Sequence, residues 1–573
     1  MSQAENSTHP RVLIIGGYGV FGSRLSRRLA KHADITVIVA GRSLAAAKRH
    51  CEAFGGTPAS IDAYGDLAEA FEEWQPTVVI DAAGPFQLYG DDPYRVVRAA
   101  LTTGAHYIDL ADDGAFVAGI SELDRAAIEA GRVALSGCSS VPAVSAAAVR
   151  ALSAGLISIE SISSVILPGN RAPRGRSVVR AILAQVGKAI RVRSGGEWTT
   201  VKGWCAVHRT SLHVSEGKAL IKRYASPIGA PDLQIFPSYF GARTVRFSAG
   251  LELIVMHRGL WLIAWCVRLG LMKSATLLTG PLLWTAERLK PFGSDRGGMI
   301  VDVTGREAES GGTQRRWTLI AEAGDGPEIP PTPAYLLALR LCQNTHRMPS
   351  GARPCLQDLR LADIEQGLAP FAISTEITSQ PVTTVFETAL DEEFSKLPPA
   401  IRDLHDVLDT RAFLGSARVE RGKGLLSRLV GWSLGFPGAT DNVPVRVDMK
   451  RSATGELWQR RFGSARFKSH LFRHPGAPTG EIWERFGALT FRIKLERQIG
   501  DLHFPVDAVR LFGLFPLPRI LVPRSDTREY VDAHGNACFD VAITHPLAGF
   551  IVRYQGWLQP IEAAAMGDDT LVR

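Results

Sequence analysis

The chain has 573 residues, too many for one hydrophobic core, and at about 100 to 200 residues per domain it predicts three or four structural units. Its 46% hydrophobic and 21% charged residues are typical of a folded protein and exclude a largely disordered or low-complexity chain. The formal net charge of +8 is a mild excess for this length, which leaves an anionic cofactor, a membrane surface or nucleic acid as partners to consider.

Cysteine spacing and the N-terminus bear on metal binding and location. The seven cysteines are scattered singly, so we expect reduced thiols and no metal site. Residues 1–10 are polar and lack the apolar core of a secretory signal, and we expect them to be disordered. Charged residues interrupt the hydrophobic stretch 251–289 before the roughly 18 uncharged residues that a membrane-spanning helix needs. We therefore expect a cytoplasmic protein.

A glycine-rich turn follows the first predicted strand. Residues 12–15 predict a buried parallel strand, and a helical pattern covers 23–31. Between them stands Gly17-Tyr18-Gly19-Val20-Phe21-Gly22, which matches GxGxxG. In this motif the first glycine makes the sharp turn, the second allows a pyrophosphate to approach the backbone, and the third lets the helix pack against the strand. A dinucleotide would lie on the amides and the positive dipole of that helix.

The second predicted strand, 35–40, ends in Gly41-Arg42-Ser43, where cofactor choice is made. NAD enzymes usually carry an acid about 20 residues after the turn, whereas NADP needs room and positive charge for its 2'-phosphate. Small Gly41 and the planar guanidinium of Arg42 fit that phosphate, so we predict NADP(H) as the cofactor. The competing interpretations are a solvated surface arginine and a Rossmann domain that has lost its cofactor.

Further strands at 59–62, 77–81, 106–110 and 133–136 alternate with helical segments, a pattern typical of a doubly wound parallel sheet. Because ligands lie at the carboxyl ends of such strands, we expect Asp62 near the adenine and the turn Ala83-Gly84-Pro85 near the nicotinamide. The predicted cofactor-binding residues are Gly17, Tyr18, Gly19, Val20, Phe21, Gly22, Gly41, Arg42, Ser43, Asp62, Ala83, Gly84 and Pro85.

Two later strand ends point to the same crevice and carry the candidate catalytic residues Asp112, Cys138 and Ser139. These side chains could orient a substrate or move a proton. A helix N-cap and a first-turn acid remain the competing interpretation for Asp112 and Asp113, and buried packing remains that for Cys138.

The segments RVLIIGGYGVFGSRLSRRLA, VIVAGRS, VVIDAAGPF and HYIDLADD together resemble the NADP-binding domain of the saccharopine dehydrogenase family, strongly over 11–145 and more weakly to about 375. The resemblance implies an NAD(P)-dependent oxidoreductase whose inserted α+β domain closes over the cofactor crevice; family members act on amino-acid conjugates and on polyketide or lipid intermediates. Cys138 and Ser139 replace the middle residues of the family's Gly-hydrophobic-Asp-Ser-Ile-Pro segment, so no catalytic role carries over to them.

From about residue 386, the segments LPPAIRDLHD, RVERGKGLLSRLVG, VPVRVDMKR and LVPRSDTREY resemble the DUF4166 domain of unknown function, which often follows such a reductase in bacterial proteins. This resemblance implies an architecture and no activity. Alternating segments such as 444–450 and 539–544 predict antiparallel strands, in a curved sheet around an apolar cavity.

We interpret two motifs in the C-terminal half as parts of the fold and not as functional sites. The basic and aromatic run 460–468 alternates as a strand with one buried face does, so we expect no nucleic acid partner. Gly431-Trp432-Ser433-Leu434-Gly435 matches the GxSxG of hydrolases, but the helical spacing before it predicts a helix end and not the strained turn that a nucleophile needs.

The hydrophobic segment 251–289 carries three tryptophans with flanking Arg and Lys. That composition suits an amphipathic helix in a membrane interface, while a helical hairpin in a dimer or domain core is the competing interpretation.

The predicted fold class is α/β, with a Rossmann-type parallel sheet at 11–145, an α+β substrate or dimerisation domain at 146–375 and a mostly antiparallel β (α+β) domain at 386–560. The predicted function is hydride transfer between NADP(H) and an apolar or amphipathic small molecule, in a protein that we expect to be a homodimer. Peripheral membrane contact through 251–289 is one of the two interpretations of that segment. The alternative is a non-catalytic NADP(H)-binding protein at a lipid surface, whose C-terminal domain binds a ligand.

Overall fold

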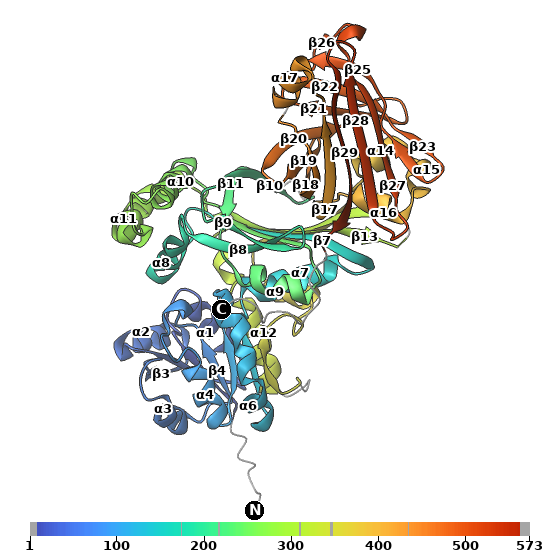
Figure 1. The fold of residues 1–573 in the computed structure, drawn as a ribbon. Helices are drawn as coiled ribbons and strands as arrows, with labels where there is room; N and C mark the ends of the chain where they lie inside the picture. The colour runs from blue at the N-terminus through green and yellow to red at the C-terminus, as the bar shows by residue number, and fades with distance from the viewer. Residues whose placement is uncertain are drawn as a thin grey trace, which may run out of the picture.

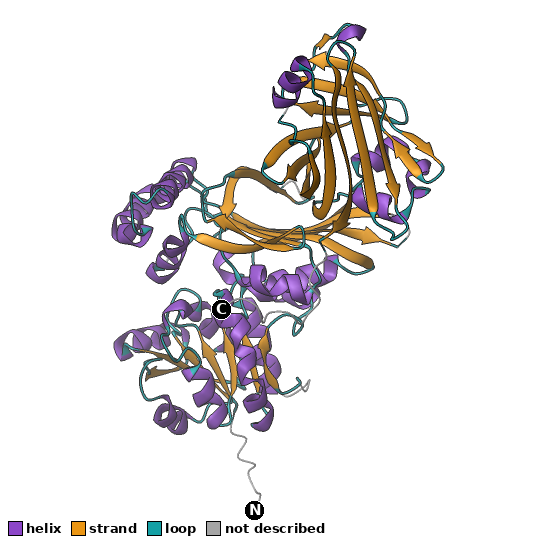
Figure 2. Ribbon diagram, in the orientation of Figure 1, coloured by secondary structure: helices purple, strands orange, loops and turns teal. Residues whose placement is uncertain are grey.

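The computed structural model of the protein describes residues 9–173, 175–215, 218–308, 311–343, 348–433 and 435–561. Most of the N-terminal stretch that we expect to be disordered, residue 434 of the GxSxG segment and residues 562–573 lie outside these ranges. Figures 1 and 2 show three large sheets in chain order, with helices around the first sheet and between the first and the second.

The first sheet is parallel throughout, with the strand order β15-β6-β5-β4-β1-β2-β3. Val12, Leu13 and Ile14 have no exposed surface, because helices pack against the sheet, and such burial explains why its strands are continuous apolar runs. The strands are β1 (Arg11–Ile15), β2 (Thr36–Gly41), β3 (Thr57–Ser60), β4 (Val78–Asp81), β5 (His106–Asp109), β6 (Val133–Ser136) and β15 (Gly351–Pro354). The helices between them are α1 (Gly22–Leu29), α2 (Leu44–Phe54), α3 (Leu67–Trp74), α4 (Arg95–Thr102), α5 (Gly114–Gly119) and α6 (Asp124–Glu129).

Two features of this sheet matter for function. The strand order reverses between β1 and β4, and ligands of such sheets bind at the carboxyl ends of the strands beside that point. The chain also returns to the sheet late, since β15 pairs with β6 and α12 (Thr332–Gln343) packs on β4 and β5. Both elements come from the range predicted for the second domain, and the short segment of β15 has no apolar run that would have predicted a strand.

The second sheet is mixed, with the order β10-β11-β12-β7-β13-β14-β16 and one parallel pair, β7 with β12. Helices α7 and α9 lie between it and the first sheet (Figure 1). Its strands are β7 (Leu156–Leu167), β10 (His208–His213), β11 (Ala219–Pro227), β12 (Thr244–Ala249), β13 (Gly297–Glu307), β14 (Gly311–Ala321) and β16 (Ile373–Pro381). The separate hairpin is β8 (Ala189–Ser194) and β9 (Glu197–Lys202), and the helices are α7 (Ser145–Leu152), α8 (Arg176–Gln185), α9 (Pro231–Tyr239), α10 (Ile254–Arg268), α11 (Thr279–Leu289) and α13 (Leu361–Leu368).

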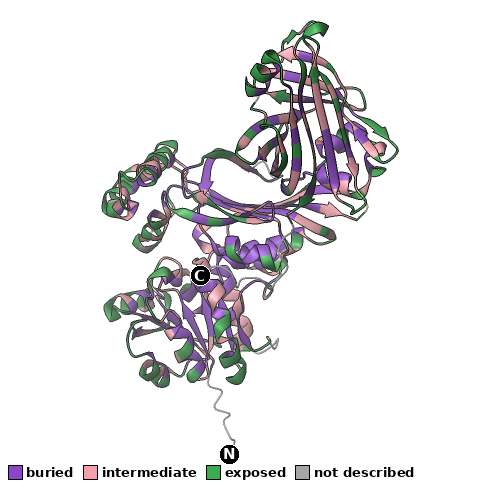
Figure 3. Ribbon diagram, in the orientation of Figure 1, coloured by how far each residue is buried: buried purple, intermediate pink, exposed green. Residues whose placement is uncertain are grey.

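The hydrophobic segment 251–289 forms α10 and α11, which project from one side of the second domain (Figure 1). α10 buries Leu260, Ala264 and Val267, while other apolar side chains of the segment remain exposed, including Leu262 and Trp284. Figure 3 shows exposed stretches along these two helices. Within the described residues, no helix is long and apolar enough to cross a membrane.

The third sheet has thirteen strands in the order β23-β24-β27-β28-β29-β17-β18-β19-β20-β21-β22-β25-β26, and all its pairs are antiparallel. Only residue 495 separates β22 from β23, although they lie far apart in this order, so the sheet curls back on itself. The strands are β17 (Thr410–Arg421), β18 (Thr440–Ser452), β19 (Gly455–Phe462), β20 (Ala465–Phe472), β21 (Glu481–Phe486), β22 (Leu489–Lys494), β23 (Glu496–Gln498), β24 (Asp501–His503), β25 (Val506–Leu511), β26 (Phe515–Pro516), β27 (Arg524–Val531), β28 (Ala537–His545) and β29 (Gly549–Pro560). The helices are α14 (Val385–Leu390), α15 (Glu392–Ser395), α16 (Pro399–Leu404) and α17 (Leu425–Ser433).

Ion pairs join the second domain to the C-terminal domain. Arg246 of β12 binds Asp409 with two hydrogen bonds, and Arg306 of β13 does the same with Asp406. At the tip of the β8–β9 hairpin, Glu197 accepts from Arg446 of β18. Bidentate pairs of this kind fix orientation as well as distance. The three sheets together confirm the predicted fold class.

Candidate functional site

The glycine turn lies between β1 and α1, at the carboxyl edge of the first sheet. The tight turn is made at Gly16, whose φ of 78° is in the left-handed region, and not at Gly17 as predicted. Gly17 is required because a Cβ there would lie 2.9 Å from the Ile14 carbonyl oxygen. A Cβ at Gly22 would overlap the Gly16 carbonyl oxygen, so the third glycine lets α1 pack on the turn as predicted.

Gly19 is the motif glycine with open space beside it, since a Cβ there would meet only the Gly16 carbonyl oxygen, 3.1 Å away. The backbone amides of Val20 and Phe21 donate to no acceptor in the described part of the chain. The start of α1 also has no side-chain cap, and its described first turn contains no acid. The positive end of the helix therefore has room and donors for an anion, which fits the pyrophosphate of a dinucleotide.

The end of β2 carries the residues predicted to bind the 2'-phosphate. Arg42 is exposed and forms no hydrogen bond or ion pair with any described residue. The Tyr18 ring lies over Gly41, where a Cβ would overlap it, and the Tyr18 hydroxyl accepts a hydrogen bond from the Ser43 amide at 2.9 Å. The Tyr18 side chain therefore reaches from the glycine turn to the end of β2.

The remaining predicted cofactor residues lie along the same edge of the sheet. Asp62 follows β3, is exposed, and accepts from the Tyr64 amide at 3.1 Å. Ala83, Gly84 and Pro85 follow β4, and Pro85 lines the cleft described below.

Two buried acids at this edge, Asp81 and Asp109, were not predicted as site residues. They are register partners on β4 and β5. Asp81 accepts from the Ala83 amide at 3.0 Å, and Asp109 accepts from the Gly137 amide at 2.7 Å and the Ala111 amide at 2.9 Å. Burial raises the pKa of Asp81 to about 6 and that of Asp109 to about 7. These carboxyls hold the loops that face the cleft. The feature of the sequence that could have identified them is an acid at the last position of each strand.

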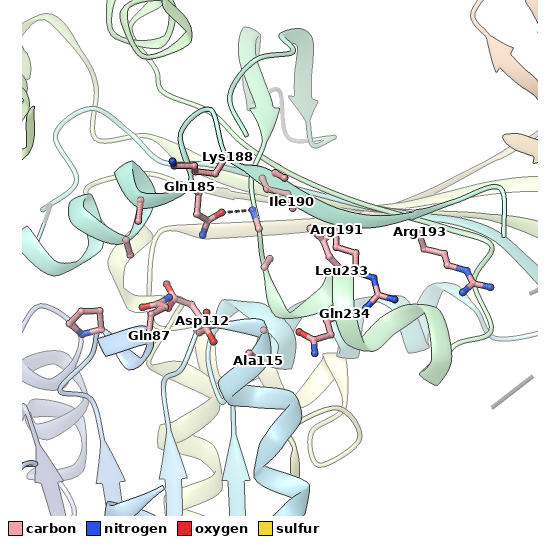
Figure 4. A pocket seen from close by; sticks show the side chains of 18 of the residues that line it. Gln87, Asp112, Ala115, Gln185, Lys188, Ile190, Arg191, Arg193, Leu233 and Gln234 are labelled. Atoms are coloured by element: carbon pink, nitrogen blue, oxygen red, sulfur yellow. Dashed lines mark hydrogen bonds between the residues drawn. The ribbon is translucent and has the colours of Figure 1, made fainter. Parts of the chain in front are cut away.

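A cleft of about 1280 Å³ opens between the first sheet and the second domain. Gln87 and Asp112 lie on the wall formed by the first domain, and β8, α8 and α9 form the facing wall (Figure 4). Gln185 is fixed there because its side chain accepts from the Gly229 amide at 2.6 Å. The volume exceeds the roughly 300 to 1000 Å³ of an ordinary ligand pocket, so it has room for a substrate beside one end of a cofactor.

The facing wall is cationic, with Arg180, Lys188, Arg191 and Arg193. The guanidinium carbons of Arg191 and Arg193 lie 4.3 and 5.6 Å from the centre of the Trp198 ring. Arg193 is 8% exposed, and its buried Nε has no hydrogen-bond partner. Burial lowers the pKa of Arg193, and the nearby Arg191 lowers it further. Because an unpaired buried donor is costly, this wall fits a ligand with an anionic group.

Asp112 is the predicted catalytic candidate that lines the cleft. Asp112 is exposed, yet desolvation by the groups packed around its carboxyl raises its pKa, as does the neighbouring Asp113. Asp113 itself caps α5, because its Oδ1 accepts from the Phe116 amide at 2.9 Å. The N-cap interpretation therefore holds for Asp113 and not for Asp112, which is left facing the cleft.

Cys138 and Ser139 are buried and do not line the cleft. Burial raises the pKa of the Cys138 thiol well above its usual value, which keeps it protonated and unreactive. The structure therefore brings one of the three catalytic candidates, Asp112, to the cleft.

The cationic wall was also missed from the sequence. The signal was Arg191-Val192-Arg193, since alternate residues of a strand point to the same face. Nothing in the local pattern indicated that this face turns toward the first domain.

The GxSxG segment ends a helix, as predicted, because α17 extends to Ser433. It lies in the C-terminal domain and not at the interdomain cleft.

Comparison with protein families supports two parts of this description. Residues 12–135 match the saccharopine dehydrogenase NADP binding domain, and residues 397–558 match the domain of unknown function DUF4166. The first match supports a nicotinamide dinucleotide as the ligand of the N-terminal domain and an oxidoreductase as the class of protein. No curated protein matches the chain.

Among solved structures, the chain is similar to saccharopine dehydrogenase (L-Glu forming) from Saccharomyces cerevisiae, with 16% identity and a TM-score of 0.46 over 64% of this chain and 100% of that one. It is also similar to a biliverdin reductase from Synechocystis in complex with biliverdin and NADP+, with 12% identity and a TM-score of 0.30 over 63% and 96% of the two chains. A third is GenD2 from gentamicin A biosynthesis in complex with NAD, with 14% identity and a TM-score of 0.26 over 56% and 73%. These similarities are too weak to carry a substrate over to this chain.

Proposed function

We propose that the protein is an NADP(H)-dependent oxidoreductase that acts on an amphipathic small molecule with an anionic group. The observation that carries this proposal is the position of the open glycine turn at the same sheet edge as a large cleft with a cationic wall. The anionic group goes beyond the substrate predicted from the sequence, and it follows from the four cations of that wall.

The residues have separable roles in this proposal. The amides at the start of α1 hold the pyrophosphate, and Arg42 holds the 2'-phosphate. A bound NADPH supplies the hydride. Arg191 and Arg193 orient the anionic group of the substrate, while Leu233 and other apolar side chains contact its hydrocarbon part. Asp112, with its raised pKa, donates or accepts the proton at the reacting atom.

Titration with NADPH and NADH, followed by intrinsic fluorescence, tests the cofactor assignment. Arg42→Ala should weaken NADPH binding by about 1.5 kcal/mol, roughly tenfold, because it removes a charge-assisted contact at an exposed site, and it should leave NADH binding unchanged. Arg125→Ala is the matched control, since Arg125 is an exposed arginine on α6, away from β2. Equal losses for both nucleotides would contradict the 2'-phosphate role of Arg42.

Incubation with fractionated cell extract tests the enzyme assignment, with NADPH oxidation as the readout. A fraction that supports oxidation by the wild type and not by Gly19→Ala would identify a substrate pool.

If NADPH binds and no fraction supports oxidation, a non-catalytic NADP(H)-binding protein at a lipid surface becomes the better assignment. The observation that favours this second candidate is the exposed apolar surface of α10 and α11, where Leu262 is 59% and Trp284 62% exposed. The same surface could join two copies in the homodimer that we expect.

A further inference from the structure

The C-terminal domain contains an apolar cavity of about 390 Å³ that the oxidoreductase proposal does not use. It lies inside the curled third sheet, so side chains from both ends of the strand order line it. Ile482 and Phe386 are among the lining side chains and have no exposed surface. The volume falls within the range of ligand pockets, and a void of this size is too large for ordinary packing.

The charged groups that line this cavity are already paired. Arg460 donates to Glu484 at 3.1 Å, and Glu529 pairs with the buried His405 at 2.5 Å. Because these side chains already bind each other and the rest of the lining is mostly apolar, the part of a ligand inside the cavity has to be apolar. At roughly the 30 Å³ that one water molecule occupies in the liquid, the cavity holds on the order of a dozen chain atoms.

The cavity is flanked by two segments that also carry exposed apolar side chains. Val430 and Phe436, in and after α17, line it, and so do Leu517 and Leu521 in the loop after β26. Figure 1 shows α17 and β26 at the same end of the domain, which we call the mouth. Its most exposed apolar side chains are Leu425 (85%), Trp432 (80%), Leu514 (73%), Phe512 (68%), Phe515 (64%) and Leu429 (60%).

The mouth is also cationic. Segments 423–433 and 512–526 contain four cationic residues, Lys423, Arg428, Arg519 and Arg524, and one acid, Asp526. All four cations are exposed, and none forms an ion pair within the part of the chain that the structure describes. Exposed large apolar side chains beside unpaired cations are the composition of surfaces that bind anionic bilayers.

We propose that the C-terminal domain docks on anionic lipid bilayers through this mouth and takes the hydrocarbon chain of a membrane lipid into the cavity. Charge complementarity and the continuity of the exposed apolar side chains with the cavity carry the proposal. The charged headgroup stays among the cations of the mouth. The proposal does not rest on the oxidoreductase assignment, since it involves neither the first sheet nor the interdomain cleft.

Flotation of the full-length protein with vesicles tests the docking. We expect binding to phosphatidylcholine vesicles that contain phosphatidylglycerol, and little binding to phosphatidylcholine alone. The double variant Leu429→Glu/Trp432→Glu should abolish binding, while Ile499→Glu should not, because Ile499 is fully exposed but lies at the β23–β24 turn, away from the mouth (Figure 1). The double variant Arg428→Ser/Arg519→Ser should weaken binding on the order of 30-fold.

Three outcomes would overturn the docking proposal. They are equal binding to neutral and anionic vesicles, equal loss in the Ile499→Glu control, and a dimer in solution that Leu429→Glu/Trp432→Glu converts to a monomer, since a second copy would then be the occupant of the mouth.

Native mass spectrometry after incubation with the anionic vesicles tests the cavity. We expect the wild type to carry one lipid and Val541→Trp, which fills the cavity from β28, to carry none while still floating with the vesicles. Fluorescence of cis-parinaric acid gives a second readout on the wild type alone, so a folding defect in the variant does not decide the outcome. Absence of both the bound lipid and the fluorescence change would refute the cavity part of the proposal.

Discussion

Substitutions in the glycine turn can test separately which glycine is needed for ligand binding and which is needed for folding. An alanine Cβ at Gly19 would meet only one atom, the Gly16 carbonyl oxygen at 3.1 Å, and Gly19 does not have a left-handed φ. A shift of a few tenths of an ångström relieves that contact, so Gly19→Ala should change stability by less than about 1 kcal/mol. The same methyl group would stand where the pyrophosphate has to approach the amides of α1. Loss of one charge-assisted hydrogen bond costs about 1.5 to 3 kcal/mol, or about 10- to 150-fold in Kd.

We would measure thermal unfolding and the Kd values for NADPH and NADH on the same samples. Gly19→Ala should keep its Tm and lose affinity for both nucleotides, because the pyrophosphate is common to them. Gly22→Ala is the contrasting variant, since its Cβ would overlap backbone, and it should lower the Tm or prevent folding. Wild-type affinity in a folded Gly19→Ala protein would refute the proposed seat of the pyrophosphate.

Two further predictions concern acids near the cleft. Asp112→Asn should lower substrate-dependent NADPH oxidation by about 100-fold or more with no change in the Kd for NADPH, and an unchanged rate would remove Asp112 from the proposed proton transfer. Burial raises the pKa of Asp109 from its usual 3.8 to about 7, so the folded state binds this proton more tightly than the unfolded chain, and the stability that this gives is lost as the pH rises through about 7. The Tm of the wild type should therefore rise relative to that of Asp109→Asn as the pH falls from about 8 to about 5, and parallel profiles would contradict the shifted pKa.

Local sequence patterns were sufficient to predict a helix or strand where neighbouring parts of the same domain bury it. The strands β1 and β6 fall where the apolar runs predict them. The role of Gly22 could also be predicted, since a strand, turn and helix in sequence determine which backbones come together.

Contacts between distant segments could not be predicted in this way. Arg193 becomes a cleft residue because the β8–β9 hairpin faces α9 and the first domain, and no periodicity within the hairpin records that placement. β15 pairs with β6 across more than two hundred residues of intervening chain, and its own sequence is too short and polar to indicate a strand. The roles of Asp112 and Asp113 could be separated only once it was known which of them caps α5.

The β8–β9 hairpin has one mechanical consequence. Its strands present Arg191 and Arg193 to the cleft, while its tip holds Arg446 through Glu197 and packs Gly195 against Thr410. A hinge motion that narrows the cleft between the first sheet and the second domain must therefore either move the whole C-terminal domain with the hairpin or break the Glu197–Arg446 pair. The hairpin thus couples the cleft mechanically to the C-terminal domain.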